Sequence, residues 1–273
     1  MVKAGAAMVA LATVAAVFGP WLVAADPAHQ ELALRLARPS WSHPFGLDEL
    51  GRDILSRIIW GTRISLSVGL SVVTVSALTG TILGAAAGYV GGRVDDLISR
   101  AVDVLLAFPG ILLAIALVAV LGPSLLNVLV ALTAIGWVGY ARLVRGHALR
   151  ARELEYVQAA RAIGATSARV IWRHVIPAAL PAVLVQATLG MAGAILSEAA
   201  LSFLGLGVQP PTPSWGTMLN GGRAHILDAP HLTMFPGVAI AALVLAFNFV
   251  GDGLRDWADP KGKGRVSASM AGG

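Results

Sequence analysis

The sequence predicts an all-α integral membrane protein with six transmembrane helices and both chain ends on the inside of the membrane. Its 273 residues are 56% hydrophobic and only 13% charged, which is about half the charged fraction of a soluble domain. The mean hydropathy is +0.75, and the apolar residues fall in blocks long enough to cross a bilayer. Aromatic content is 6%, and small and aliphatic residues dominate, as in closely packed membrane helices.

Six stretches have the length and hydrophobicity of membrane spans, which need about 20 mainly apolar residues. They are residues 4–24, 64–90, 102–121, 125–143, 181–204 and 233–250. A signal peptide is the alternative for the first, because Lys3 precedes it. Its apolar run is long for a signal peptide, however, and Pro20-Trp21 stands where small cleavage-site residues belong. We therefore expect residues 1–25 to form an uncleaved first transmembrane helix.

Positive charge gives the expected orientation. The net charge is +5, and most of the 20 lysines and arginines fall in segments that lie inside if the N-terminus is inside. A nucleic-acid partner is not expected, because no basic run is interleaved with aromatic residues. The chain has no cysteine, which excludes disulfides and thiolate metal sites.

Residues 26–63 are predicted to form an extracytoplasmic segment between the first two spans. Within it, residues 48–60 place apolar side chains on one helical face and Asp53 and Arg57, four residues apart, on the other. This pattern indicates a short amphipathic helix on the outer membrane surface, with Trp60 at the level of the lipid headgroups.

The core of the protein is predicted at residues 64–259, followed by a tail at 260–273 that lacks apolar periodicity and is expected to be disordered. Small residues recur at every fourth position of the second span and form one stripe. These residues are Ser76, Gly80, Gly84 and Gly88. Because small side chains let a neighbouring helix come close, we interpret the stripe as helix packing and not as a ligand site.

The segment between the fourth and fifth spans, residues 145–177, is too long for a simple connector. Its pattern predicts a helix over residues 155–163 that Gly164 ends in a left-handed conformation. Ala159 and Ala160 are small enough for a partner surface to approach the backbone. Two interpretations remain open: a helical knob that transmits a push from a partner into the membrane, and a hairpin that only links two spans.

A second short helix follows in the same loop. Thr166 or Ser167 is placed to cap its N-terminus. Pro177 is expected to end this helix, and Pro181 to open the fifth span in its first turn.

The loop also carries a spaced motif that resembles the EAA loop of binding-protein-dependent ABC import permeases. It reads Gln158-Ala159-Ala160, three residues, Gly164, nine residues, and His174-Val175-Ile176-Pro177. The family pattern has Glu, Ile and Leu where this chain has Gln158, His174 and Ile176, while the Gly and Pro spacing is intact. The resemblance implies contact with an ATPase through Tyr156, Gln158, Ala159, Ala160, Arg161, Gly164, Ala165, Arg169, His174 and Pro177.

Two further motifs resemble the C-type subunit of dipeptide and oligopeptide permeases. They are HPFGLDELGRD at residues 43–53 and LSFLGLGVQPP at 201–211, the latter followed by PSWG at 213–216. With the loop, the resemblance covers residues 41–259. It implies a type I ABC importer permease fold, with a cytoplasmic coupling helix between the fourth and fifth spans, in a bacterial inner membrane.

The same resemblance implies the partners of the chain. They would be a second, B-type permease, two ABC ATPase subunits and an extracytoplasmic substrate-binding protein, with membrane lipid around the permeases. No cofactor is expected on this chain, and ATP and Mg would bind to the ATPases. Short peptides are the expected substrates; nickel chelates, glutathione and haem are the alternatives that related systems carry.

The remaining residues give little support to other functions. There is no Gly-Lys-Ser or Gly-Lys-Thr of a nucleotide-binding loop, and there are no hydrolase or metal-site motifs, so the chain is not expected to be an enzyme. An intramembrane hydrolase would need a Ser/His or paired-Asp site within the spans. A proton-coupled secondary transporter would need several mid-span carboxylates, and only Glu198 is a candidate. We expect Glu198 either to line a translocation path or to make a hydrogen bond at a helix or subunit interface.

Overall fold

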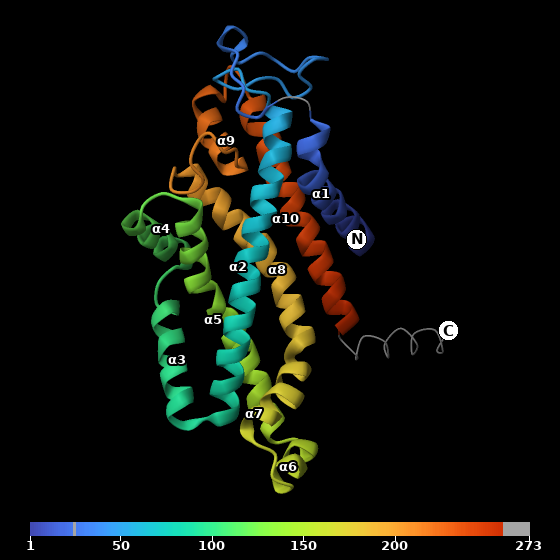
Figure 1. The fold of residues 1–273 in the computed structure, drawn as a ribbon, viewed down its shortest axis with the longest axis vertical. Helices are drawn as coiled ribbons and strands as arrows, with labels where there is room; N and C mark the ends of the chain where they lie inside the picture. The colour runs from blue at the N-terminus through green and yellow to red at the C-terminus, as the bar shows by residue number, and fades with distance from the viewer. Residues whose placement is uncertain (24–25, 259–273) are drawn as a thin grey trace, which may run out of the picture.

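The structure, a computed structural model, describes residues 1–23 and 26–258, and the regular elements in those ranges are helices (Figure 1). Five helical segments there are long and apolar enough to cross a membrane, and a bent helix pair raises the number to as many as six. The predicted all-α fold class with six spans is therefore confirmed. The predicted disordered tail lies outside the described residues.

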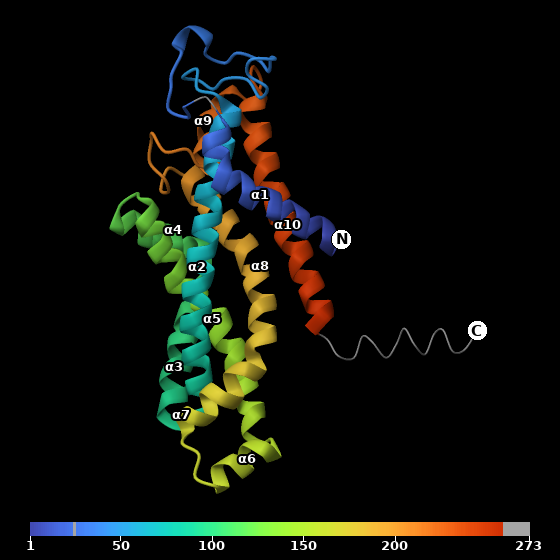
Figure 2. The same cartoon turned by 45° about the vertical axis from the view of Figure 1, so that its right-hand side comes forward.

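The spanning elements follow the predicted order along the chain. They are α1 (Val2–Leu22), α2 (Ile54–Val90), the bent pair α3 (Gly92–Leu106) and α4 (Gly110–Leu121), α5 (Leu125–Arg152), α8 (Ile176–Phe203) and α10 (His231–Ala258). Figure 2 shows α1 running obliquely across α2 and α10, and it packs on both helices.

Helices α2 and α5 pack against each other along much of their length and form the centre of the bundle (Figure 1). The small-residue stripe of α2 lies in this contact. A Cβ atom added to Gly80, Gly84 or Gly88 would collide with a backbone carbonyl oxygen of α5. Ser76 lies against Gly136 of α5 in the same way. The stripe thus brings two helix backbones into direct contact, which is how helices associate where lipid is the solvent.

The prediction of a separate amphipathic helix over residues 48–60 is wrong. Helix α2 already begins at Ile54, so that the apolar residues of this segment form its first turns. Asp53 caps the helix by accepting a hydrogen bond from the backbone N–H of Ser56 at 2.8 Å. Arg57 is only 4% exposed. The polar pair that was assigned to a water-facing side is therefore turned into the protein.

The third span, predicted over residues 102–121, is broken into two helices in the structure. Helices α3 and α4 meet at an angle of 88°. The break ends at Pro109, directly before α4. Proline has no backbone N–H to donate and disfavours helical geometry at the residue before it, so a helix tends to stop there. The uninterrupted apolar run concealed this corner.

The two prolines of the fifth span do not act as predicted. Helix α7 (Ser167–Val170), the π-helical turn η2 (Ile171–Val175) and α8 form one continuous helical segment. Pro177 lies in the first turn of α8 and does not end a helix, and Pro181 lies inside α8. Membrane helices tolerate internal proline because neighbouring groups satisfy the freed carbonyls.

Two structures occupy opposite ends of the bundle (Figure 1). We call the first the cap; it consists of residues 26–53 and helix α9 (Trp215–Gly222). We call the second the knob; it consists of residues 153–175, which include α6 (Glu155–Ala162), α7 and η2.

Candidate functional site

The knob is the segment that the loop motif singled out. Helix α6 ends as predicted, because Gly164 has a φ of +88°, a left-handed conformation that glycine adopts at little cost. The backbone N–H of Ala165 donates to the carbonyl of Ala160 at 3.0 Å, and that of Gly164 donates to Arg161 at 2.9 Å. These bonds satisfy the last carbonyls of α6 and reverse the chain toward α7.

The second turn of the knob decides between the two capping residues considered from the sequence. Thr166 is the N-cap of α7, and its hydroxyl accepts a hydrogen bond from the backbone N–H of Arg169 at 3.3 Å. Ser167 is the first residue of the helix. The rings of Tyr156 and His174 lie with centroids 5.6 Å apart, which joins α6 to η2.

The inner face of the knob is a firm hydrophobic contact. Val157, Val170 and Val175 are fully buried. They belong to one apolar cluster with Ala148 of α5 and Ala179 of α8. The knob therefore shares one hydrophobic core with two long helices of the bundle.

The outer face of the knob is unpartnered and partly apolar. Ile163 is 87% exposed, Trp172 63% and Tyr156 49%. Of these three, only Tyr156 was among the coupling residues predicted from the sequence. Five more of the predicted residues are exposed here: Gln158, Ala159, Arg161, Gly164 and Arg169. Large apolar side chains exposed beside polar ones are typical of surfaces that contact another protein or a membrane. Of the remaining candidates, Pro177 is exposed on α8, outside the knob.

An ion pair just above the knob escaped the sequence analysis. Arg145 of α5 donates from Nε and Nη2 to the two carboxylate oxygens of Asp95 in α3, at 2.6 and 2.7 Å. This bidentate geometry is the strong form of an arginine–carboxylate contact. The partners are 50 residues apart, so neither helical spacing nor a local motif could have paired them. The bond ties the bent pair α3–α4 to the helix that carries the knob.

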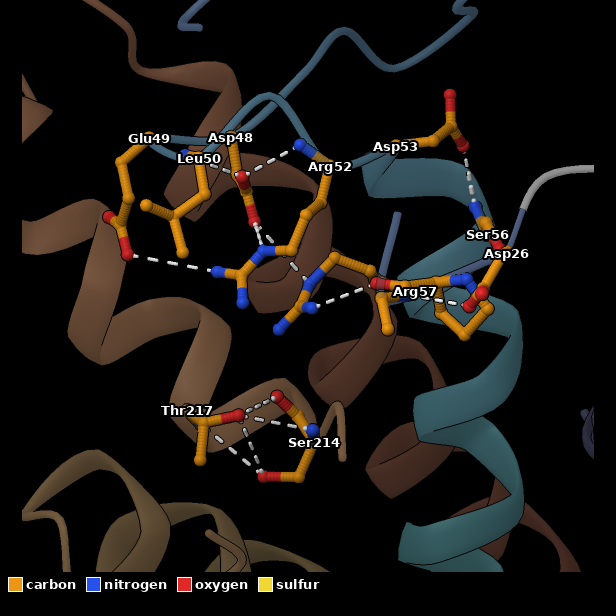
Figure 3. A network of polar contacts seen from close by, with 12 residues as sticks. Asp26, Asp48, Glu49, Leu50, Arg52, Asp53, Ser56, Arg57, Ser214 and Thr217 are labelled. Atoms are coloured by element: carbon orange, nitrogen blue, oxygen red, sulfur yellow. Dashed lines mark hydrogen bonds and ion pairs between the residues drawn. The ribbon is translucent and has the colours of Figure 1, made fainter. Parts of the chain in front are cut away.

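The cap is held together by a network of paired charges within the chain (Figure 3). One carboxylate oxygen of Asp48 accepts from the backbone N–H groups of Leu50 and Arg52, at 2.9 and 3.0 Å. The other oxygen accepts from Nε of Arg52 at 2.7 Å and lies 3.5 Å from Nε of Arg57. Arg57 also donates to the carbonyl of Pro27 at 3.1 Å. One buried carboxylate thereby joins the cap loop to the first turn of α2.

Each of the two family motifs outside the knob contributes a residue to contacts at this end of the bundle, Glu49 from the first and Trp215 from the second. The indole N–H of Trp215 donates to the carbonyl of Ile58 at 3.0 Å. A Cβ atom on Gly61 would lie 2.9 Å from the same indole ring, and one on Gly221 would lie 2.7 Å from a carboxylate oxygen of Glu49. Segments more than 150 residues apart thus form a single tightly packed unit.

Glu198 lies inside the protein, in α8 close to the cap. It is fully buried, and its Oε1 accepts a hydrogen bond from the hydroxyl of Ser202 at 2.7 Å. The same hydroxyl accepts from the backbone N–H of Val208 at 3.2 Å. Glu198 therefore takes part in a local network that fixes the turn after α8. Within the described part of the chain, no group of three or more His, Cys, Asp or Glu side chains is placed to hold a metal ion.

Comparison with known proteins identifies the family. Residues 80–263 match the family described as "Binding-protein-dependent transport system inner membrane component". The chain is 50% identical over 248 residues to the dipeptide transport system permease protein DppC of Alkalihalophilus pseudofirmus, which covers 91% of this chain and 82% of that protein. It is 47% identical over 265 residues to the glutathione transport system permease protein GsiD of Escherichia coli O157:H7, covering 97% and 88% respectively.

A solved structure supports the fold. A chain from the inward-facing structures of the MetNI methionine ABC transporter superposes with a TM-score of 0.61 at 19% identity, covering 74% of this chain and 97% of that chain. The predicted type I permease fold and the multi-pass inner-membrane location are both confirmed. The chain belongs to the family of inner-membrane components of binding-protein-dependent transport systems.

Proposed function

We propose that this chain is a permease subunit of an ATP-driven importer of dipeptides and oligopeptides, and that it forms half of the translocation path. The observation that carries the proposal is the 50% identity, over nearly the whole chain, to a dipeptide permease. A relative at 42% identity is a probable D,D-dipeptide permease of E. coli K12. Glutathione, itself a peptide, is the second candidate, because relatives at 47–49% identity are glutathione permeases.

Membership of the family implies an ATPase and a substrate-binding protein as partners. We propose in addition a B-type permease as the second half of the path and two ATPase subunits on the cytoplasmic side. ATP and Mg would bind to those subunits, since this sequence contains no nucleotide-binding loop.

The knob is the proposed contact with the ATPase. Its outer face exposes Ile163 and Tyr156, which we propose as apolar anchors for the partner. Its inner face packs against α5 and α8 in a cluster that includes Val157. Closure of the ATPase pair would push on α6, and α5 would carry the movement along the bundle. The bond between Arg145 and Asp95 would then draw α3 along with α5.

A proton-coupled secondary transporter finds no new support. That mechanism needs a carboxylate that faces the transported ligand or a water-filled path. Glu198 is instead fully buried beside Ser202.

Co-purification tests the proposal. The chain is expressed with its neighbouring genes and isolated in detergent, and ATP hydrolysis is measured with binding protein carrying either a dipeptide or glutathione. We expect a second permease and an ATPase to purify with the chain, and one of the two ligands to stimulate hydrolysis. A chain that purifies alone, without associated ATPase activity, would contradict the proposal.

A further inference from the structure

A cavity of about 270 Å³ lies between α2, α4, α5 and α8. The described residues that line it include no Asp, Glu, Lys, Arg or His. Its polar groups are the hydroxyls of Ser76, Tyr140 and Ser197 and the side-chain amide of Gln186. The cavity is therefore uncharged but able to donate and accept hydrogen bonds.

Two of these hydroxyls have unused hydrogen-bonding capacity. Ser76 is 1% exposed, and its Oγ has no hydrogen-bond partner among the described residues. The hydroxyl of Tyr140 makes a single long contact, 3.5 Å, to the carbonyl of Gln186. Burying a hydroxyl without a good partner is unfavourable, so the Tyr140 hydroxyl favours a ligand or water in the cavity that supplies a better bond.

Glycines pack directly against two of the hydroxyls. A Cβ atom on Gly136 would lie 2.5 Å from Oγ of Ser76, and one on Gly190 would lie 2.6 Å from the hydroxyl oxygen of Tyr140. Ser76 is thereby enclosed in the contact between α2 and α5 and contributes to the wall of the cavity. Gly110 and Gly193 line the same cavity and add no side-chain bulk to it.

Gln186 also lines a second cavity, which extends toward the knob end of the bundle. This cavity has a volume of about 880 Å³ and is lined by α5, α8 and α10. It contains His147, Arg150 and Arg255 and no carboxylate. In the described part of the chain, neither arginine forms an ion pair within 4 Å. Gln186 thus stands between an uncharged chamber and a cationic one, and the cationic one attracts carboxylates.

We propose that the uncharged cavity is a contact site for the peptide bonds of the translocated substrate, with Tyr140, Gln186 and Ser197 as its hydrogen-bonding residues. This inference rests on the proposed function. Peptide N–H and C=O groups match hydroxyls and an amide, whatever side chains the peptide carries. A neutral site holds its ligand weakly, which suits passage, because a translocated molecule must leave the site as readily as it enters. Gln186 would hand the peptide on to the cationic cavity.

The first test measures peptides imported per ATP hydrolysed by the complete transporter in proteoliposomes. Gln186→Leu removes the amide and keeps the bulk, and we expect the ratio to fall at least fivefold. Thr188→Val is the matched control on the same helix, because the Thr188 hydroxyl bonds to the carbonyl of Val185 at 2.8 Å and lines none of the cavities described above. The control should keep the wild-type ratio.

The second test detects the ligand directly and uses the absence of cysteine from the chain. In Ser197→Cys transporter, a water-soluble thiol reagent should react with the new thiol, and transported peptide should slow the reaction at least threefold. Ser42→Cys is the control, since Ser42 is exposed in the loop of the cap, outside the spanning helices, and lines neither of the two cavities. Peptide should not change its rate of modification.

The outcomes separate this inference from the proposed function. If the wild-type transporter imports peptide, but Gln186→Leu keeps its ratio and peptide leaves Ser197→Cys unprotected, the contact site is refuted while the function stands. If the wild-type transporter neither imports peptide nor hydrolyses ATP in response to it, the proposed function fails and takes the contact site with it.

Discussion

The cap and the knob differ in how much of their surface contacts the rest of this chain. In the cap, Asp48 lies buried between Arg52 and Arg57, and Trp215 bonds to the start of α2. In the knob, only the inner face is buried, and Ile163 at its tip is almost fully exposed. The cap therefore makes its polar contacts within this chain, whereas the knob leaves an exposed surface that we propose another chain covers. This contrast separates changes that unfold the protein from changes that uncouple it.

The largest effect on stability is expected from Asp48→Ala in the cap. The substitution leaves two arginines without their shared carboxylate and breaks two backbone hydrogen bonds. Removing one partner of a buried charge network costs about 3–5 kcal/mol, which thermal unfolding in detergent will show as a lower transition midpoint. Glu49→Ala is the control, because its contact to Arg52 is 3.8 Å long and partly exposed, and it should cost less than about 1 kcal/mol. Equal losses in the two variants would show that the cap network is not the stabilising element.

Ile163→Asp should produce the opposite result in the knob. The side chain is 87% exposed, so the free energy of unfolding should stay within about 0.5 kcal/mol of the wild-type value. An apolar anchor at the centre of an interface contributes about 2 kcal/mol or more, so the Kd of the ATPase for the purified permease should rise about 30-fold, and less ATPase should be retained on it. Arg93→Asp, an exposed change outside the knob, is the control. Retention of the ATPase by Ile163→Asp would contradict the proposed contact.

Gly164→Val tests the turn of the knob. A β-branched residue at a φ of +88° carries a penalty of about 1–2 kcal/mol, which should lower the population of the docking conformation about five- to thirtyfold. ATP hydrolysis stimulated by loaded binding protein should fall by a similar factor. Gly164→Asn should recover most of it, because Asn tolerates this backbone conformation. If both variants are equally impaired, backbone strain is not the cause.

The smallest effect is expected from Tyr156→Ala, which removes the ring contact to His174. A ring pair of this kind contributes about 0.5–1.5 kcal/mol, and Tyr156 is already half exposed. Hydrogen exchange in α6 should therefore accelerate modestly while the exchange of α2 is unchanged. Tyr156→Phe keeps the ring and should exchange like the wild type. Faster exchange in both helices would mean that the knob is not an independent element.

Much of this fold could be predicted, because apolar length alone identifies most spans. The spacing of the glycines also identifies the face of α2 that packs on another helix, which the structure shows to be α5. The sequence failed where a tertiary partner decides the structure. Asp53 and Arg57 have the spacing of a surface helix, yet contacts with the cap bury them. The 88° corner before Pro109 interrupts a run that hydropathy cannot distinguish from a straight helix.

The candidate site shows the same limit. The left-handed turn at Gly164 follows from local backbone chemistry and was predicted, and the N-cap of α7 was narrowed to Thr166 or Ser167. The bond from Arg145 to Asp95, and the cavity that joins Ser76 to Gln186, depend on helices that only the folded chain brings together. Local patterns thus located the knob, while the parts that connect it to the bundle had to be found in three dimensions.

Site-specific cross-linking tests the central contrast most directly. Because the chain has no cysteine, a photo-crosslinker can be attached at Ile163→Cys in the knob or at Trp41→Cys in the cap, where Trp41 is fully exposed. In the assembled transporter we expect a cross-link to the ATPase from position 163 and none to it from position 41. Cross-links to the ATPase from both positions, or from position 41 alone, would contradict the assignment of the knob as the coupling surface.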